Sequence, residues 1–352
     1  MMEQHLAALL KMGNKIGVPS SLVNLAFVEG QQGDLAEERK ASEQALAAFR
    51  ELNSRQGEAY AMSNLADALA KQGDLAGAKQ KLEHALAVAR EYKDEAPTDF
   101  NLDGLGWLLF RQGDLDGAEK ALNEVLAVSR ESGDKNVIAS VLSDLGVVLE
   151  SRGKLADARK NFQEGLAARN QIGAVGAVAQ SQVLLASLSI EEERSAESVA
   201  PLRDARKVFQ EQGRIGDELD ADTVLARALV LQGRYSEAQK ELDAAAVPSA
   251  RSEDRLLHID LAIISALMRA AAGKPAEAVR SLATAIAEAT RIGYVPAQLE
   301  GRLALAEIKM KSGQVSAGRA GLEALEKDAT AKGFLLIARK AAAAMKGSHY
   351  RG

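Results

Sequence analysis

Glycine recurs along this chain at intervals of 40 residues, and this period limits the possible folds more than any other feature. The first series consists of Gly33, Gly73, Gly113, Gly153, Gly233, Gly273 and Gly313, and only Glu193 interrupts it. A second series consists of Gly13, Gly133, Gly173, Gly213, Gly293 and Gly333. Each unit therefore has two glycine positions about half a repeat apart, which is the pattern expected of two helices that each end at a glycine turn.

The segments between the glycines show the apolar period of amphipathic helices. In the second unit, Met62, Leu65, Ala66 and Leu69 share one helical face, and Leu75, Ala78, Leu82, Ala85 and Leu86 share another. Gly73 separates the two segments at a turn where a positive φ is needed. Asp34, Asp74 and Asp114 follow their glycines directly, as N-caps of the second helix should. The repeating unit is thus predicted to be a helical hairpin.

The residue types at fixed positions of these hairpins resemble the tetratricopeptide-repeat family in its 40-residue form. A leucine followed by a small residue recurs in the first helix: Leu25-Ala26, Leu65-Ala66, Leu105-Gly106, Leu145-Gly146, Leu185-Ala186, Leu225-Ala226 and Leu305-Ala306, with Ser265-Ala266 in the seventh unit. The small residue of the second helix is Ala78, Ala118, Ala158, Ala238 or Ala278, and it is replaced by Glu38, Ser198 and Gly318. The resemblance implies an all-α, right-handed superhelical solenoid of about eight antiparallel hairpins.

The repeat phase also predicts the organisation of the chain. Residues 1–17 correspond to the second helix of an incomplete repeat, which suggests a piece of a larger protein or a lost upstream domain. Residues 18–333 form eight hairpins, residues 334–347 a closing helix, and residues 348–352 a frayed tail. We expect Arg339, Lys340 and Lys346 on the exposed side of the closing helix.

The fifth unit departs most from the pattern. Glu193 replaces the turn glycine, and Pro201 lies where the second helix should already be under way. Because proline removes a helical hydrogen bond, we predict a shortened second helix and the weakest interface of the array between Glu191 and Pro201. The acidic run Glu191-Glu192-Glu193 is interpreted as a solvated turn.

Composition and motifs argue against catalysis. The chain has 352 residues, no cysteine, four histidines and a net charge of −5. No two histidines have metal-ligand spacing, and no phosphate-binding or hydrolase motif occurs, so we expect neither an enzyme nor a cofactor. The acidic balance disfavours direct nucleic-acid binding, and the longest apolar stretch is interrupted by His258, Asp260 and Arg269, which excludes a membrane span. A cytoplasmic protein is the default expectation, and the sequence does not specify its oligomeric state.

The resemblance implies that a partner would lie in the inner groove formed by the first helices. The candidate groove residues are mostly aromatic or basic: Phe27, Tyr60, Phe100, Trp107, Phe110, Arg111 and Arg227. Exposed aromatics beside arginine suit the capture of a peptide or helix, although the same rings could instead pack against the neighbouring first helix. The carboxylate clamp of chaperone-binding relatives is not expected, since the corresponding positions are Val23, Phe27, Asn64, Phe100 and Gly104 and only the asparagine matches.

Two functions remain open at this point. The first is a non-catalytic scaffold that binds a protein or peptide, resembling the C-terminal repeat arrays of bacterial signalling and regulatory proteins, which follow a kinase or DNA-binding domain. The second is a receptor module that closes around a signalling peptide or small molecule. A closed inner side with convergent polar groups would favour the receptor, and an open, featureless one would favour the scaffold.

Overall fold

The computed structural model describes residues 2–91 and 95–347, which contain eighteen α-helices and no strand. The odd-numbered helices are α1 (Met2–Lys11), α3 (Leu35–Glu51), α5 (Leu75–Glu91), α7 (Leu115–Ser132), α9 (Leu155–Gln171), α11 (Ser195–Gln212), α13 (Tyr235–Arg251), α15 (Pro275–Ile292) and α17 (Val315–Ala331). The even-numbered helices are α2 (Gly17–Gln31), α4 (Arg55–Lys71), α6 (Glu95–Arg111), α8 (Lys135–Ser151), α10 (Val175–Glu191), α12 (Ile215–Leu231), α14 (Arg255–Ala271), α16 (Val295–Lys311) and α18 (Leu335–Met345). The predicted tail, residues 348–352, lies outside the described residues.

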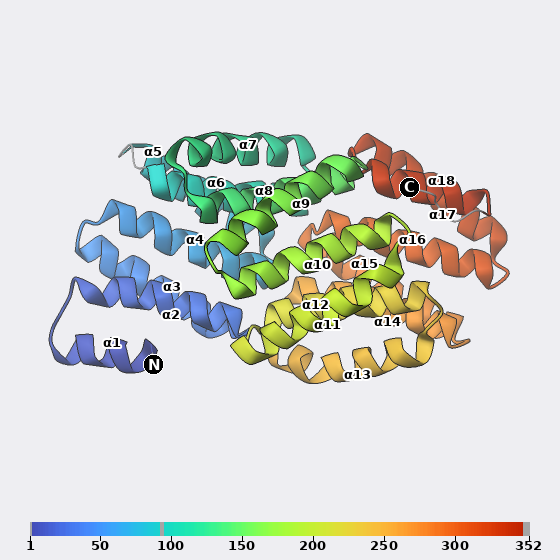
Figure 1. Ribbon diagram of the computed structural model, residues 1–352, viewed down its shortest axis with the longest axis horizontal. Coiled ribbons are helices and arrows are strands. Elements are labelled where there is room, and N and C mark those ends of the chain that lie inside the picture. The colour runs from blue at the N-terminus through green and yellow to red at the C-terminus, as the bar shows by residue number, and fades with distance from the viewer. Residues whose placement is uncertain (1, 92–94, 348–352) are drawn as a thin grey trace.

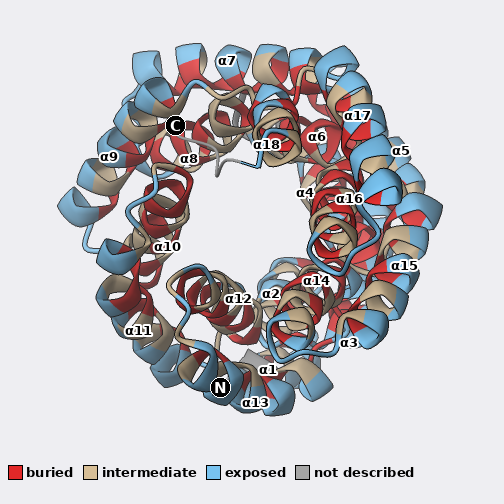
Figure 2. Cartoon of the chain, turned by 90° about the vertical axis from the view of Figure 1, so that its right-hand side faces the viewer, coloured by how far each residue is buried: buried red, intermediate tan, exposed pale blue. Residues whose placement is uncertain are grey.

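Consecutive helices pack as antiparallel neighbours and wind into a superhelix (Figure 1). Viewed along its length, the even-numbered helices form an inner ring and the odd-numbered helices an outer ring, with buried residues concentrated between the two (Figure 2). The predicted all-α solenoid of about eight hairpins and a closing helix is therefore confirmed. Among the described residues, no helix has both the length and the apolar character that crossing a membrane requires.

The turns are built as the glycine series predicts. Gly73 and every other member of the two glycine series has a positive φ, between 66° and 88°. Glu193 adopts the same left-handed conformation, with a φ of 61°, at the one position where the first series lacks its glycine. Asp34 and Asp114 cap the helices that follow them by accepting a hydrogen bond from the third backbone N–H along, that of Glu37 or Gly117.

Small residues allow the two helices of a hairpin to approach closely. A Cβ atom on Gly106 would lie 2.7 Å from Cγ of Leu122, and one on Gly146 would lie 2.3 Å from Cε1 of Phe162. Leu122 and Phe162 are fully buried and fill the space that these glycines leave. The leucine–small pairs of the sequence thus serve close packing between helices.

The prediction for the fifth unit is wrong. Helix α11 has 18 residues and continues through Pro201, so it is not shortened. Pro201 deprives the Glu197 carbonyl of its helical partner, but Glu197 is exposed, where water can replace that hydrogen bond. The interface with α10 is also well formed, since the buried Ser198 hydroxyl donates to the Ala186 carbonyl at 2.8 Å.

The superhelix completes a full turn and then touches itself along a contact that we call the seam. A Cβ atom on Gly33 would lie 3.1 Å from Cα of Ser252, and one on Gly73 would lie 3.1 Å from Cγ2 of Ile292. These two pairs have the same separation along the chain, about five and a half repeats. The seam therefore joins equivalent points of the first turn and of the beginning of the second.

The closing helix forms the last part of the seam. Phe334 and Ile337 belong to one buried cluster that also contains Phe110 and Leu115 from the first turn. The Arg339 guanidinium donates to the Gly153 carbonyl at 2.7 Å, and Lys340 Nζ lies 2.6 Å from Oε2 of Glu191. The expectation that Lys340 would be exposed is therefore wrong, because α18 packs across the seam as well as on the eighth hairpin.

Candidate ligand-binding face

One column of equivalent positions runs along the inner helices, with one residue from each of seven successive repeats. Its members are Tyr60, Phe100, Ser140, Gln180, Asp220, Asp260 and Glu300. None of these side chains is fully buried. The column is aromatic in the second and third units, polar and neutral in the fourth and fifth, and acidic from the sixth to the eighth. We call it the inner column.

The aromatic end of the inner column consists of a contacting pair. The ring centroids of Tyr60 and Phe100 are 6.0 Å apart with an interplanar angle of 49°. Phe100 is 48% exposed, and Phe27 on α2 is 61% exposed. Large exposed aromatic surfaces in a soluble protein are suited to contact with another molecule.

The other predicted aromatic residues are packed to different degrees. The Trp107 ring stacks on Phe110 with centroids 5.1 Å apart, and the Arg111 guanidinium lies 5.1 Å from the Trp107 centroid. Trp107 and Arg111 are half-buried. Phe110 is only 6% exposed and lies 6.3 Å from the ring of Phe334. The expectation that Phe110 would be accessible is wrong, because the closing helix covers it from the second turn.

Arg227, the remaining predicted residue, is held in a charge cluster. Its Nη2 lies 2.5 Å from Oε1 of Glu191, whose side chain is 3% exposed, and Lys340 contacts the other oxygen of the same carboxylate. Burial raises the pKa of Glu191, but Arg227 and Lys340 outweigh this and lower it to about 2. Glu191 is therefore not part of a solvated turn, which corrects the interpretation of the acidic run.

Carboxyl groups are frequent along the later inner helices, and none of them is among the groove residues predicted from the sequence. Asp260 accepts a hydrogen bond from the Tyr294 hydroxyl at 3.0 Å, and burial raises its pKa to about 8 despite that bond. Burial and the charge of Glu191 likewise raise the pKa of Glu150 to about 8. The signal was present in the sequence, since Asp220, Asp260 and Glu300 are spaced by 40 residues.

The neutral middle of the inner column is tied to neighbouring carboxylates. Ser140 donates to Oδ2 of Asp103 at 3.1 Å, and the Gln180 amide donates to Oδ1 of Asp217 at 2.7 Å. Burial raises the pKa of Asp103 to about 6. In the second unit, the Asn64 amide donates to the Val23 carbonyl at 3.1 Å, so the one residue that matched the carboxylate clamp is already engaged.

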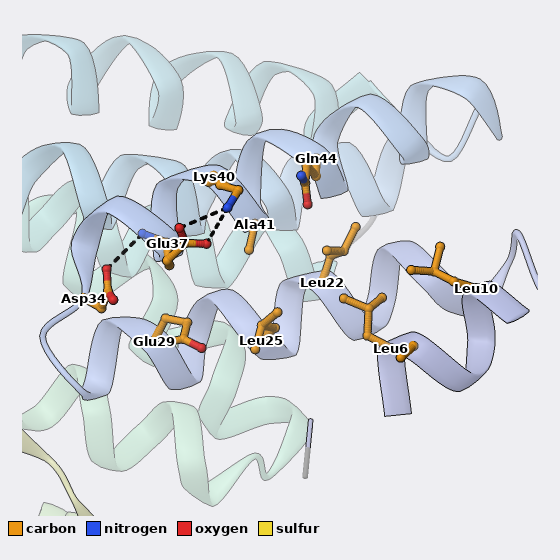
Figure 3. Close-up of a pocket in the computed structure, with 11 residues that line it drawn as sticks. Leu6, Leu10, Leu22, Leu25, Glu29, Asp34, Glu37, Lys40, Ala41 and Gln44 are labelled. Atoms are coloured by element: carbon orange, nitrogen blue, oxygen red, sulfur yellow. Dashed lines mark hydrogen bonds and ion pairs between the residues drawn. The ribbon is translucent and has the colours of Figure 1, made fainter. Parts of the chain in front are cut away.

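Two cavities occur away from these residues. The first has a volume of about 470 Å³ and lies between α1, α2 and α3, with an apolar floor that includes Leu6 and Leu22 and a polar rim that includes Glu29 and Lys40 (Figure 3). The second, of about 370 Å³, lies on the seam near Gly73. Within the described residues, no group of three or more histidine, aspartate or glutamate side chains could hold a metal ion.

Comparison with known proteins identifies the family. The MalT-like TPR region, a family model, matches residues 32–297. No curated protein matches the chain. A crystal structure of a Rap protein complexed with competence and sporulation factor has a TM-score of 0.70 at 11% identity, covering 94% of this chain and 98% of that one.

A second structure, a signal transduction ATPase with a tetratricopeptide repeat sensor from Pyrococcus horikoshii, has a TM-score of 0.53 at 16% identity. It covers 94% of this chain and 52% of that one. At these identities the structural similarities establish the fold alone. Because the family model covers most of the chain, this protein belongs to the MalT-like tetratricopeptide-repeat family.

Proposed function

We propose that the protein is a non-catalytic interaction module that binds an extended peptide segment of a partner along its inner helices. The inner column carries this proposal, since its successive repeats can contact successive short segments of an extended ligand. An apolar or aromatic side chain of the peptide would pack against Tyr60 and Phe100. Basic side chains would lie toward Asp220 and Glu300. The preferred peptide therefore has an apolar part and a basic part in a fixed order.

A receptor function is the second candidate, and the seam favours it. A superhelix that closes on itself can change shape when a ligand bridges its two turns, whereas an open scaffold has no such contact to alter. The structurally similar Rap protein was crystallised in complex with competence and sporulation factor, which supports ligand binding by this type of superhelix. Small-angle X-ray scattering with and without bound peptide distinguishes the two, because only the receptor should change its dimensions.

The polarity of the inner column can be tested with labelled peptides. Two fluorescein-labelled ten-residue peptides would carry two phenylalanines and four lysines, or two phenylalanines and four glutamates, and binding would be followed by fluorescence anisotropy. The lysine peptide should bind more tightly, and salt should weaken its binding. Equal affinities for both peptides would contradict the proposal.

Amino-acid substitutions then test the aromatic end and the acidic end of the inner column separately. Phe100→Ala should weaken binding of the lysine peptide by about thirtyfold, as expected for a buried aromatic anchor. The double change Asp220→Asn and Glu300→Gln should weaken binding of that peptide while leaving the glutamate peptide unaffected or better bound. Asp204→Asn on the outer helix α11 is the matched control and should change neither affinity. An effect of Asp204→Asn as large as that of the inner pair would remove the inner face as the site.

A further inference from the structure

The two ends of the seam differ in chemistry. At its C-terminal end, Phe110 from the first turn and Phe334 from the second lie in one buried apolar cluster with Val295 and Ile337. At its N-terminal end, the contact is between backbone and polar groups, with Gly33 against Ser252. The C-terminal end is thus held by apolar burial together with the polar contacts of Arg339 and Lys340, and the N-terminal end by hydrogen bonds.

Glu253 makes two hydrogen bonds across the N-terminal end. Its backbone N–H donates to the Gly33 carbonyl at 3.1 Å, and its Oε2 accepts from the Ala36 N–H at 2.8 Å. Ala36 lies in the first turn of α3, where backbone N–H groups have no partner within the helix. The Asp34 side chain already bonds to the Glu37 N–H. Glu253 therefore completes the cap of α3 from the other turn of the superhelix.

The repeat pattern explains how Glu253 reaches this position. The second glycine series, which includes Gly213 and Gly293, would place a glycine at 253. Here α13 ends at Arg251 and is followed by Ser252 in an extended conformation, with φ −88° and ψ 136°. The departure from the repeat therefore replaces an ordinary left-handed turn with a segment that docks on α3.

Two buried carboxyl groups lie behind this contact, since Glu38 and Asp254 are 2% and 7% exposed. Beside them, Lys71 Nζ is 2.5 Å from Oδ2 of the more exposed Asp67. Oε2 of Glu38 is buried without a hydrogen-bond partner among the described residues. Burial raises the pKa of Glu38 to about 8 and also raises that of Asp254. Water entering an opened seam would restore the solvation that these groups lose when it closes.

We propose that the seam is a gate that opens at its Glu253 end, where α2 and α3 separate from the segment before α14, while the closing helix keeps the other end shut. The N-terminal end combines two hydrogen bonds with desolvated charges, so its separation costs less than exposing the apolar cluster around Phe334. Opening there widens access to the inner column without unfolding any hairpin. The gate does not depend on the identity of the ligand.

The experiment uses thiol reactivity, because the chain has no cysteine of its own. Ser252→Cys places a thiol at the N-terminal end of the seam, and Ala338→Cys places one at the C-terminal end; both positions are 6% exposed. Each single-cysteine protein is treated with a disulfide reagent such as DTNB under native conditions. The thiol at 252 should react about a hundredfold faster than the thiol at 338, because only the former is exposed by local opening.

The role of Glu253 is tested in the same two backgrounds. Glu253→Ala removes the acceptor and should speed the reaction at 252 by about tenfold while leaving that at 338 unchanged. Glu253→Gln keeps an acceptor oxygen and should leave both rates close to those of the parent proteins. Equal rates at 252 and 338, or no effect of Glu253→Ala, would overturn the gate. So would a parallel acceleration at both positions, since it would mean that the two ends open together.

Discussion

Phe100 and Phe110 lie in the same helix, α6, but have opposite surroundings. Phe110 is buried against the closing helix, whereas Phe100 is 48% exposed beside Tyr60. Phe110→Ala should lower the free energy of unfolding by about 3–5 kcal/mol, since it leaves a cavity in a buried cluster. Phe100→Ala should lower it by less than about 1 kcal/mol. Guanidinium denaturation of both variants checks this, and equal losses would mean that Phe100 is also a packing residue.

The environment of Glu150 predicts a loss of stability on the alkaline side. Its pKa is about 8 in the folded protein against an ordinary 4.5, so the native state binds more protons than the unfolded chain between these values. Stability should therefore fall as the pH rises from about 5 to 8. Glu150→Gln removes the contribution of Glu150 to this dependence and should melt higher than the parent protein at pH 9 but not at pH 5. Thermal melts across this range provide the measurement.

Glu191 on the neighbouring helix should behave in the opposite way. Its pKa of about 2 in the folded protein means that its contribution is present above pH 4.5 and is lost as the pH falls toward 2. Glu191→Gln should therefore destabilise the protein at pH 7 and have little effect at pH 2.

At the scale of the element, Pro201 shows that a helix packed in an array can tolerate a proline in its interior. The packing of α11 on α10 keeps the helix continuous through the proline. Pro201→Ala should restore the missing hydrogen bond and raise the free energy of unfolding by about 1–2 kcal/mol, after the loss of proline's restriction on the unfolded chain is subtracted. Chemical denaturation should show a higher midpoint with the same slope, and a lower midpoint would mean that the ring itself is needed for packing.

Removal of the closing helix should affect two distant parts of the chain. Truncation before Phe334 exposes the eighth hairpin and also Phe110 and Leu115 in the first turn. Hydrogen exchange should therefore increase in α17 and in α6–α8 alike, with a lower melting temperature. Truncation after Met345 is the control and should leave exchange in both regions unchanged. Faster exchange confined to α17 would mean that α18 is only an end cap.

The elements could be predicted from the sequence because each repeat carries its own local signals. The glycines that require a positive φ, the capping aspartates and the leucine–small pairs act within about 40 residues of one another. The burial of Phe110 and Lys340 could not be predicted in this way. Both depend on the position of α18 in the second turn of the superhelix. That position is the total of small rotations between successive repeats, and no single residue determines it.

The candidate site was predictable to the same extent. The repeat phase predicts inward positions of the first helices for Tyr60 and Phe100, and their ring centroids lie 6.0 Å apart in the structure. Their role in binding stays a prediction. The ion pair between Arg227 and Glu191 depends on contacts between neighbouring repeats and the closing helix. The 40-residue period of the sequence does not specify those contacts.

At the scale of the whole molecule, the seam should change how the array unfolds. In an open solenoid each repeat contacts only its neighbours, and unfolding can begin at either end. Here one apolar cluster joins α6–α8 to α16–α18. We expect the fluorescence of Trp107, the single tryptophan, and the far-ultraviolet circular dichroism to report the same midpoint in guanidinium. Separate midpoints would show that the turns unfold independently.

The spacing of the seam also restricts how this gene can change over generations. Open repeat arrays gain or lose whole units easily, since a duplicated unit stacks like the others. In this chain, a duplication between Gly33 and Ser252 would shift every later residue by one repeat and bring new side chains opposite α3. Glu253 would then face the wrong unit, and the closing helix would miss Phe110. We therefore expect related chains to keep this number of repeats and to vary by point substitution rather than by duplication.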